Sequence, residues 1–198
     1  MIKQLIIPFI LFITINSFAQ EERKVDAYRN KGYFNITRFS YINVNEAKLE
    51  TYSPTYGVIV TGLPVDKATA YSLQTINGYF ISPYFSAGIG VGLDGYANPT
   101  INTLPIFLDF RLYLDDYISS MYLCLDFGTL LKIKNGTKGG RMLNLGIGYK
   151  LPLKKNRFII VTDISYSLKQ ISYDGQLIRT SDNKILIKGI MLSLGVIF

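Results

Sequence analysis

The stretch TLPIFLDFRLYL, residues 103–114, alternates between two kinds of side chain along its whole length. The even-numbered positions are all apolar: Leu104, Ile106, Leu108, Phe110, Leu112 and Leu114. The odd-numbered positions are mixed and include Asp109 and Arg111. Because successive side chains of a β-strand point to opposite faces, this period of two predicts a strand with one apolar face and one charged face.

The same period recurs along the chain. It is clear in SMYLCLDFGTLL (120–131), MLNLGIGYKL (142–151), RFIIVTDISYSLK (157–169) and GIMLSLGVIF (189–198). Pro, Gly, Asn and Asp residues separate these runs and indicate turns. The pattern predicts eight strands at about residues 32–43, 67–81, 83–96, 103–114, 119–132, 140–151, 157–171 and 185–198.

The predicted connections alternate in length, and the longest covers residues 44–66. In an antiparallel up-and-down arrangement, the short turns then lie at one end together with both termini, and the long loops lie at the other end. Outer-membrane barrels show this asymmetry, with short periplasmic turns and longer external loops.

The first residues have the features of a secretory signal peptide. Lys3 supplies a positive charge, residues 5–15 are almost wholly apolar, and Ser17 and Ala19 place small residues before a cleavage site. We therefore expect a cleaved signal peptide over 1–19, a periplasmic N-terminal segment over 20–31 and one barrel domain over 32–198. The apolar run is short for a membrane-spanning helix, and no later run reaches the roughly 18 apolar residues that such a helix needs.

The apolar faces of eight strands can point outward into lipid or inward into a soluble calyx of the lipocalin kind. An eight-stranded barrel is only just wide enough inside for side chains to fill it, so large apolar residues from every strand would overfill it. The opposite faces carry glycines, among them Gly88, Gly90, Gly146 and Gly148, which suit a narrow interior. They also lack the continuous Lys and Glu cover of a soluble exterior. The pattern favours the membrane barrel.

The export signal, the alternating strands and the aromatic Phe198 together resemble the small, eight-stranded, porin-like outer-membrane proteins of Gram-negative bacteria. The resemblance implies an all-β fold, an eight-stranded antiparallel up-and-down transmembrane β-barrel in the cell outer membrane. It implies outer-membrane lipid and lipopolysaccharide as surroundings, and the barrel-assembly machinery as a partner during biogenesis. Phe198, at the end of the apolar face of the last strand, resembles the signal that this machinery reads.

The composition argues against most catalytic chemistry. The chain has no histidine, which is the commonest general base and transition-metal ligand, and its single cysteine, Cys124, cannot form an intramolecular disulfide. The net charge of +7 is dispersed rather than gathered in a basic run, so we expect no nucleic-acid partner. We expect no enzyme, no catalytic residue, no cofactor and no metal site.

The stretch Gly90–Gly95 matches the dinucleotide-binding pattern G-x-G-x-x-G. That reading requires a strand before the glycines and a helix after them. Here the glycines begin inside a predicted strand, and Tyr-Ala-Asn-Pro follows them. Small residues on the inner face of a tight barrel explain the pattern better.

Charged residues fall by parity on the face opposite the lipid: Asp109, Arg111, Asp126, Lys150, Asp163 and Lys169. Arg38 joins them if the first strand has the expected register. Buried charges are tolerated when they are paired, so a polar network filling the lumen is expected. Asp126 and Asp163 could instead form a carboxylate pair for acid–base or proton-binding work, but sequence spacing does not place them side by side.

Two functions remain open at this stage. The first is a structural and surface-interaction barrel with a plugged polar lumen, which acts through its external loops, chiefly residues 44–66. The alternative is a narrow pore or small-ligand transport barrel, and a soluble lipocalin-like binding barrel is a weaker third. Eight strands leave little open lumen, which favours the first. The sequence identifies no surface partner.

Overall fold

The structure is a computed structural model that describes residues 30–53, 55–65, 68–97, 101–116, 119–132, 137–153, 158–173 and 183–198. The predicted signal peptide and most of the predicted N-terminal segment lie outside these residues. The described residues form nine strands: β1 (Gly32–Ser53), β2 (Gly57–Gly62), β3 (Thr69–Ser82), β4 (Phe85–Tyr96), β5 (Ile101–Tyr113), β6 (Ser120–Lys132), β7 (Thr137–Leu153), β8 (Phe158–Tyr173) and β9 (Asn183–Ile197). Within this part of the chain, no helix is long and apolar enough to cross a membrane.

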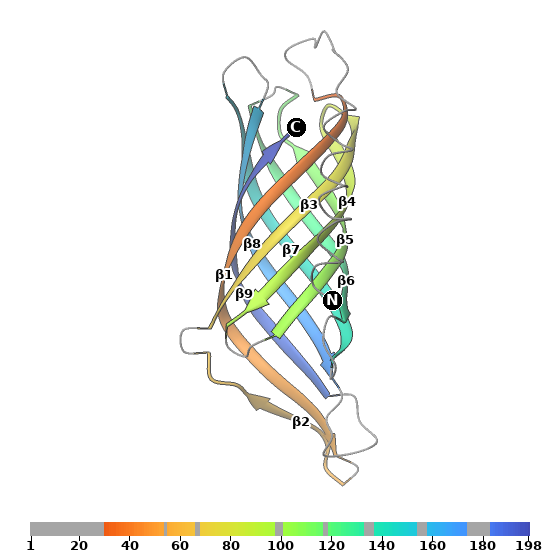
Figure 1. The fold of residues 1–198 in the computed structure, drawn as a ribbon, viewed down its shortest axis with the longest axis vertical. Helices are drawn as coiled ribbons and strands as arrows, with labels where there is room; N and C mark the ends of the chain where they lie inside the picture. The colour runs from red at the N-terminus through yellow and green to blue at the C-terminus, as the bar shows by residue number, and fades with distance from the viewer. Residues whose placement is uncertain are drawn as a thin grey trace, which may run out of the picture.

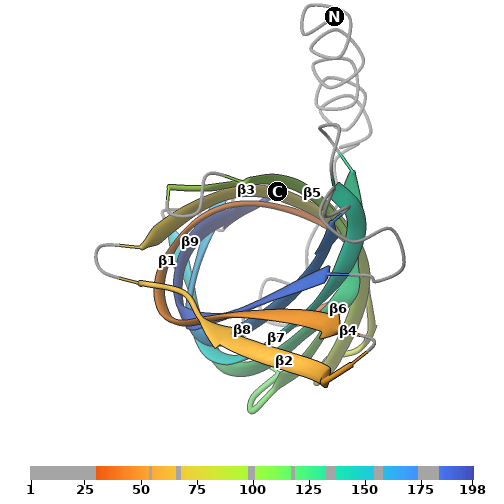
Figure 2. The same cartoon turned by 90° about the horizontal axis from the view of Figure 1, so that it is seen from below.

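Eight of the strands form a closed antiparallel barrel (Figure 1). β1 pairs with β3, each later strand pairs with the next, and β9 pairs back with β1. The view along the barrel in Figure 2 shows the resulting ring of strands. The predicted eight-stranded antiparallel up-and-down barrel is therefore confirmed.

A path through directly paired, inward-facing residues shows how the strands are staggered. It starts at Ile36 on β1, passes once around the barrel from β3 to β9, and returns to β1 at Ala47. The path therefore closes 11 residues further along β1, and one of these residues belongs to an irregularity in pairing between Val44 and Glu46. A closed barrel of tilted strands requires such a stagger.

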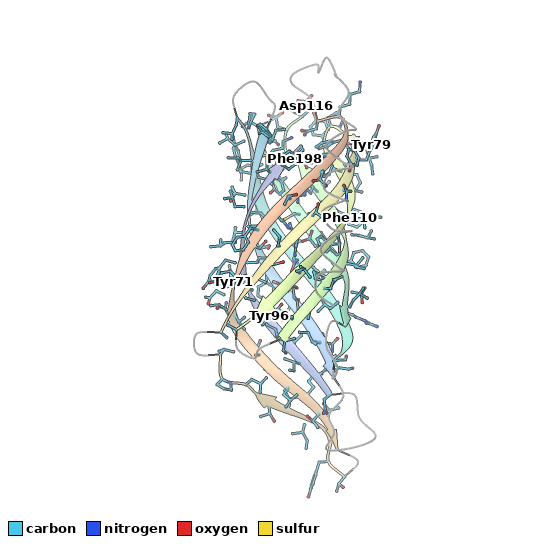
Figure 3. The ribbon with its side chains drawn as sticks, in the orientation of Figure 1. Tyr71, Tyr79, Tyr96, Phe110, Asp116 and Phe198 are labelled. Atoms are coloured by element: carbon cyan, nitrogen blue, oxygen red, sulfur yellow. The ribbon has the colours of Figure 1, made fainter. Side chains whose placement is uncertain are left out.

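The two ends of the barrel differ. Gly32, the turn between β3 and β4, and Phe198 lie at one end, which we call the terminal end. β2 lies at the other end, which we call the hairpin end (Figure 1). Figure 3 shows Tyr79 and Phe198 near the terminal end and Tyr71 closer to the hairpin end.

Residues 44–66 are not the long loop that the sequence predicted. β1 continues to Ser53, because its residues up to Glu50 pair with β9, and β2 pairs with Lys48–Ser53 on the other side. The bulge after Val44 shifts the alternation by one residue, so Val44 and Ala47 both face inward. This shift hides the strand from a search for a period of two.

The outer wall carries the apolar faces that the sequence predicted. Exposed side chains on successive strands include Leu108 on β5, Leu123 on β6, Leu145 on β7, Ile164 on β8 and Leu194 on β9. Towards the hairpin end, the outward positions become polar at Arg141, Gln170 and Lys188. The wall thus has an apolar band that ends in polar residues on its hairpin side and includes exposed aromatic residues such as Tyr79 and Phe198 near the terminal end, which suits a barrel that crosses a bilayer.

This facing predicts a depth-dependent effect of charge on the outer wall. Leu108→Arg, near the middle of the apolar band, should lower the free energy of unfolding by about 2–4 kcal/mol in lipid vesicles, because the charge must enter hydrocarbon. The matched variant Leu114→Arg, at the terminal edge of the band, should lower it by about 0–1 kcal/mol. Urea unfolding of both variants measures the difference, and equal costs would contradict the assigned facing.

Candidate functional site

The interior of the barrel is the candidate site, because all six sequence-predicted lumen residues are buried there. Arg38 is buried with them, as the expected register of β1 required. Among the described residues, the buried acidic and basic side chains are four cations and four carboxylates: Arg38, Arg111, Lys150, Lys169, Asp94, Asp109, Asp126 and Asp163. The formal charges of these eight groups cancel.

Arg38 on β1 holds together the centre of the lumen. Its Nη2 donates to Asp126 Oδ2 across the barrel, and its Nη1 lies 3.9 Å from Asp163 Oδ2. Its Nε donates to Gln74 Oε1 at 2.7 Å, and its guanidinium carbon lies 5.7 Å from the centre of the Phe107 ring. One arginine therefore neutralises carboxylates from two other strands. Burying these charges as a paired group costs much less free energy than burying one of them unpaired.

Arg111 on β5 forms the second part of this central cluster. Its Nε and Nη2 donate to the two oxygens of Asp109 at 2.9 and 3.0 Å, which is a two-point contact between planar groups. Its guanidinium carbon lies 5.0 Å from the centre of the Tyr122 ring, and the Tyr122 hydroxyl donates to Asp163 Oδ2 at 3.4 Å. The central cluster thus joins both arginines and three carboxylates through Tyr122.

A separate ion pair lies closer to the hairpin end. Lys169 Nζ donates to Asp94 Oδ2 at 2.5 Å, and Thr103 Oγ1 donates to the same oxygen at 3.1 Å. Asp94 was not predicted as a lumen residue. Its parity with Gly88, Gly90 and Gly92 was the signal that could have identified it, because these positions alternate on one face.

Lys150 lies near the terminal end, and its Nζ forms no ion pair with a carboxylate of the described residues. Its Nζ donates to Asn30 Oδ1 and lies 4.8 Å and 5.4 Å from the centres of the Tyr113 and Phe80 rings. Asn30 also donates through Nδ2 to the carbonyl of Pro83 at 2.8 Å. The last residues before β1 therefore close this end of the lumen, a contact that no local pattern in the sequence indicates.

Glycines on the inner wall make room for these large side chains. A Cβ atom on Gly90 would lie 2.3 Å from the Phe107 ring, and one on Gly148 would lie 2.4 Å from the Tyr122 ring. Each ring fills the space above a glycine on the neighbouring strand. Within the Gly90–Gly95 pattern, Gly90 has this packing role, a Cβ on Gly92 would lie 2.7 Å from Gln74 Cγ, and Gly95 has room for a Cβ. β4 continues through the pattern to Tyr96 with no helix in the described residues that follow.

The inner wall at the hairpin end is apolar. Its buried residues come from five strands: Val44, Ala47, Leu130, Met142, Ile171, Ile185 and Ile187. Leu49, Leu63 and Val65 are partly buried and pack against this core. Lys169 is directly paired with Met142 and Ile187, so the Lys169–Asp94 ion pair borders this apolar region.

The remaining sequence-predicted residues have simple surroundings. Cys124 is buried in the lumen. Asp126 and Asp163 are both near Arg38, which gives each a charge partner. No group of three or more His, Cys, Asp or Glu residues able to hold a metal ion occurs in the described ranges.

Phe198 lies on the outer face, with its ring edge-on to that of Phe158 at a centroid distance of 6.0 Å. Its backbone N donates to the carbonyl of Asn35 at 2.9 Å, so it extends the pairing of β9 with β1. Its role as an assembly signal stays a prediction.

Known structures share this architecture. The solid-state NMR structure of the outer membrane protein AlkL in DMPC lipid bilayers matches with a TM-score of 0.57 and 17% identity, over 90% of this chain and 94% of that one. The crystal structure of the outer membrane protein OprG from Pseudomonas aeruginosa matches with a TM-score of 0.52 and 11% identity, over 86% of this chain and 97% of that one. No protein-family model and no curated protein sequence matches the chain. The predicted resemblance is confirmed at the level of the fold.

The central cluster predicts strong coupling between Arg38 and Asp126. Arg38→Met should lower the free energy of unfolding by about 3–5 kcal/mol, because it leaves buried carboxylates unpaired. In the double variant Arg38→Met, Asp126→Leu, the total loss should be clearly smaller than the sum of the two single losses. Urea unfolding in vesicles provides the four values, and additive losses would show that the two side chains are independent.

Proposed function

We propose that this protein is an integral outer-membrane barrel with a sealed polar lumen, which anchors and displays the β1–β2 hairpin at the external surface. The observation that carries the proposal is the central cluster, in which Arg38, Arg111, Phe107 and Tyr122 are each at most 2% exposed. Side chains of this size, linked to one another across the barrel, support a lumen with no continuous path for a solute. The formal charges cancel over the lumen as a whole, because Lys150 offsets the net charge of −1 of the central cluster.

The location is supported by several independent features. The predicted signal peptide provides export, the apolar outer band suits a bilayer, and the two solved structures of similar fold are outer membrane proteins. With the termini in the periplasm, the hairpin end faces outward.

The hairpin is the part of the barrel best placed to contact other molecules. β2 pairs with β1 along one edge, and Tyr56 and Val58 are 81% and 66% exposed. Val60 on β2 is also exposed, so apolar side chains project beyond the barrel. Exposed apolar residues on a strand of this kind are typical of interaction surfaces.

Conductance tests the sealed lumen. The protein is taken from the outer-membrane fraction, and heat-modifiable gel mobility verifies that it is folded. It should then give no unit conductance steps in planar bilayers. Arg38→Ala together with Phe107→Ala removes two large side chains from one level of the lumen and should produce steps. The matched variant Leu108→Ala changes the neighbouring outward residue and should not. Stable unit steps from the unaltered protein would contradict the sealed lumen, and recovery in the soluble periplasm would contradict the location.

A second candidate function is binding of a small apolar molecule at the hairpin end. The apolar inner wall there favours it, because Ile171 and Ile187 face inward beside the exposed hairpin. Apolar walls with few polar groups are typical of small-ligand sites.

Methyl NMR of the barrel in nanodiscs distinguishes this candidate. Naphthalene, as an uncharged probe, should shift the methyl resonances of Ile171 and Ile187. The outward methyl groups of Ile147 and Ile164 serve as matched controls for probe dissolved in the lipid. Shifts confined to the outward methyl groups would count against a lumen site.

A further inference from the structure

The outer faces of β1 and β3 carry the same chemistry on directly paired residues. The outward pairs are Tyr33 with Tyr79, Asn35 with Asn77, Thr37 with Thr75, Phe39 with Leu73, and Tyr41 with Tyr71. The four central residues, Asn35, Thr37, Thr75 and Asn77, are polar. We call them the Asn–Thr patch.

Apolar and aromatic side chains surround the Asn–Thr patch on the outer wall. Tyr33 and Tyr79 lie on its terminal side, and Phe39 and Leu73 lie on its hairpin side. Figure 3 shows Tyr79 at the terminal side of the patch and Tyr71 further toward the hairpin end along β3. Laterally, Thr37 pairs with Val196 on β9, and Thr75 and Asn77 pair with Val91 and Ile89 on β4. Asn35 also pairs through its backbone with Phe198 at the end of β9, so the patch lies in the part of the apolar band nearest the terminal end.

The patch satisfies only part of its own hydrogen-bonding capacity. Asn35 Nδ2 donates to Thr75 Oγ1 at 3.1 Å and to Asn77 Oδ1 at 2.8 Å. Tyr33 also donates its hydroxyl hydrogen to Asn77 Oδ1. Within the described residues, Asn35 Oδ1 and Asn77 Nδ2 have no hydrogen-bond partner. Asn35 is only 9% exposed and Asn77 is half-buried, so one acceptor and one donor have narrow access to surroundings in which an unpaired amide is costly.

We propose that the Asn–Thr patch is the contact surface between two copies of this chain in the membrane. A two-fold axis along the membrane normal, between β1 and β3, brings Asn35 of each copy opposite Asn77 of the other. The free Oδ1 of Asn35 then accepts from the free Nδ2 of Asn77, and the reverse contact forms by symmetry. An interface of this kind uses the same surface on both copies, which the repeated chemistry of β1 and β3 matches.

The second copy fits the patch better than a lipid does. Acyl chains offer no hydrogen-bonding groups at this depth, and the four patch residues carry no charge that would select an ionic headgroup. The proposal rests on the proposed membrane insertion and is independent of whether the lumen is sealed.

The oligomeric state in nanodiscs or vesicles tests the proposal. Single-molecule photobleaching of labelled protein should show dimers. Asn35→Leu combined with Asn77→Leu should raise the dimer dissociation constant at least tenfold, because both hydrogen bonds are lost while the wall stays apolar. The matched variant Thr162→Leu removes an exposed hydroxyl from the outer wall of β8 and should leave the constant unchanged. Heat-modifiable mobility reports folding and insertion of each variant separately.

Disulfide trapping gives a second test that does not depend on the leucine variants. In a Cys124→Ala background, Thr37→Cys protein mixed with Thr75→Cys protein should crosslink to a dimer under mild oxidation in the bilayer, because the proposed axis places these two positions opposite each other. Protein with Ile164→Cys on the far wall should not crosslink. An inserted protein that stays monomeric over a wide range of protein-to-lipid ratios would overturn the proposal. Binding of a different protein to the patch would not rescue it, because the proposal requires a second copy of this chain. A dimer unaffected by the asparagine substitutions would overturn it as well.

Discussion

The pairing of β9 with β1 is the constraint on which the rest of this structure depends. It runs from Ile36 with Ile197 to Glu50 with Lys184 and converts a sheet with two edges into a ring. In hydrocarbon, every backbone N–H and C=O must find a partner within the protein, so a sheet of this size is compatible with a bilayer only when it is closed. The closing pair also extends furthest along β1, and this explains why β1 projects beyond its pairing with β3 as one side of the hairpin.

Closure with eight strands dictates what can lie inside. The interior is narrow, so each large side chain needs a small residue beside it, as Phe107 has Gly90 and Tyr122 has Gly148. Charges there have no access to bulk water and must be matched, which the four buried cations and four buried carboxylates achieve. The same packing that makes the barrel stable also fills its centre. The proposed sealing is in this sense a consequence of barrel size, and under that proposal the two ends and the outer wall are the surfaces on which this protein can act.

Two places depart from simple alternation, and each is informative. The bulge after Val44 reverses the facing of β1 just where the strand leaves the barrel for the hairpin. The polar residues Asn35 and Asn77 interrupt the apolar wall at one position on paired strands. Departures from a pattern that the rest of a protein obeys are costly, and they are expected where a molecule makes contacts beyond its own fold.

The sequence by itself determined the class of fold, the number of barrel strands and the direction in which most side chains point. These follow from a period of two, which is a local property of a strand and can be read without knowing its neighbours. Parity alone thus placed Asp109, Arg111 and Lys169 on the inner face. Only the tertiary structure decided which of these residues meet. Arg38 and Asp126 are 88 residues apart in the chain, and Asn30 reaches Lys150 from outside any strand. Such contacts depend on the stagger accumulated around the closed ring, and no single segment encodes that stagger.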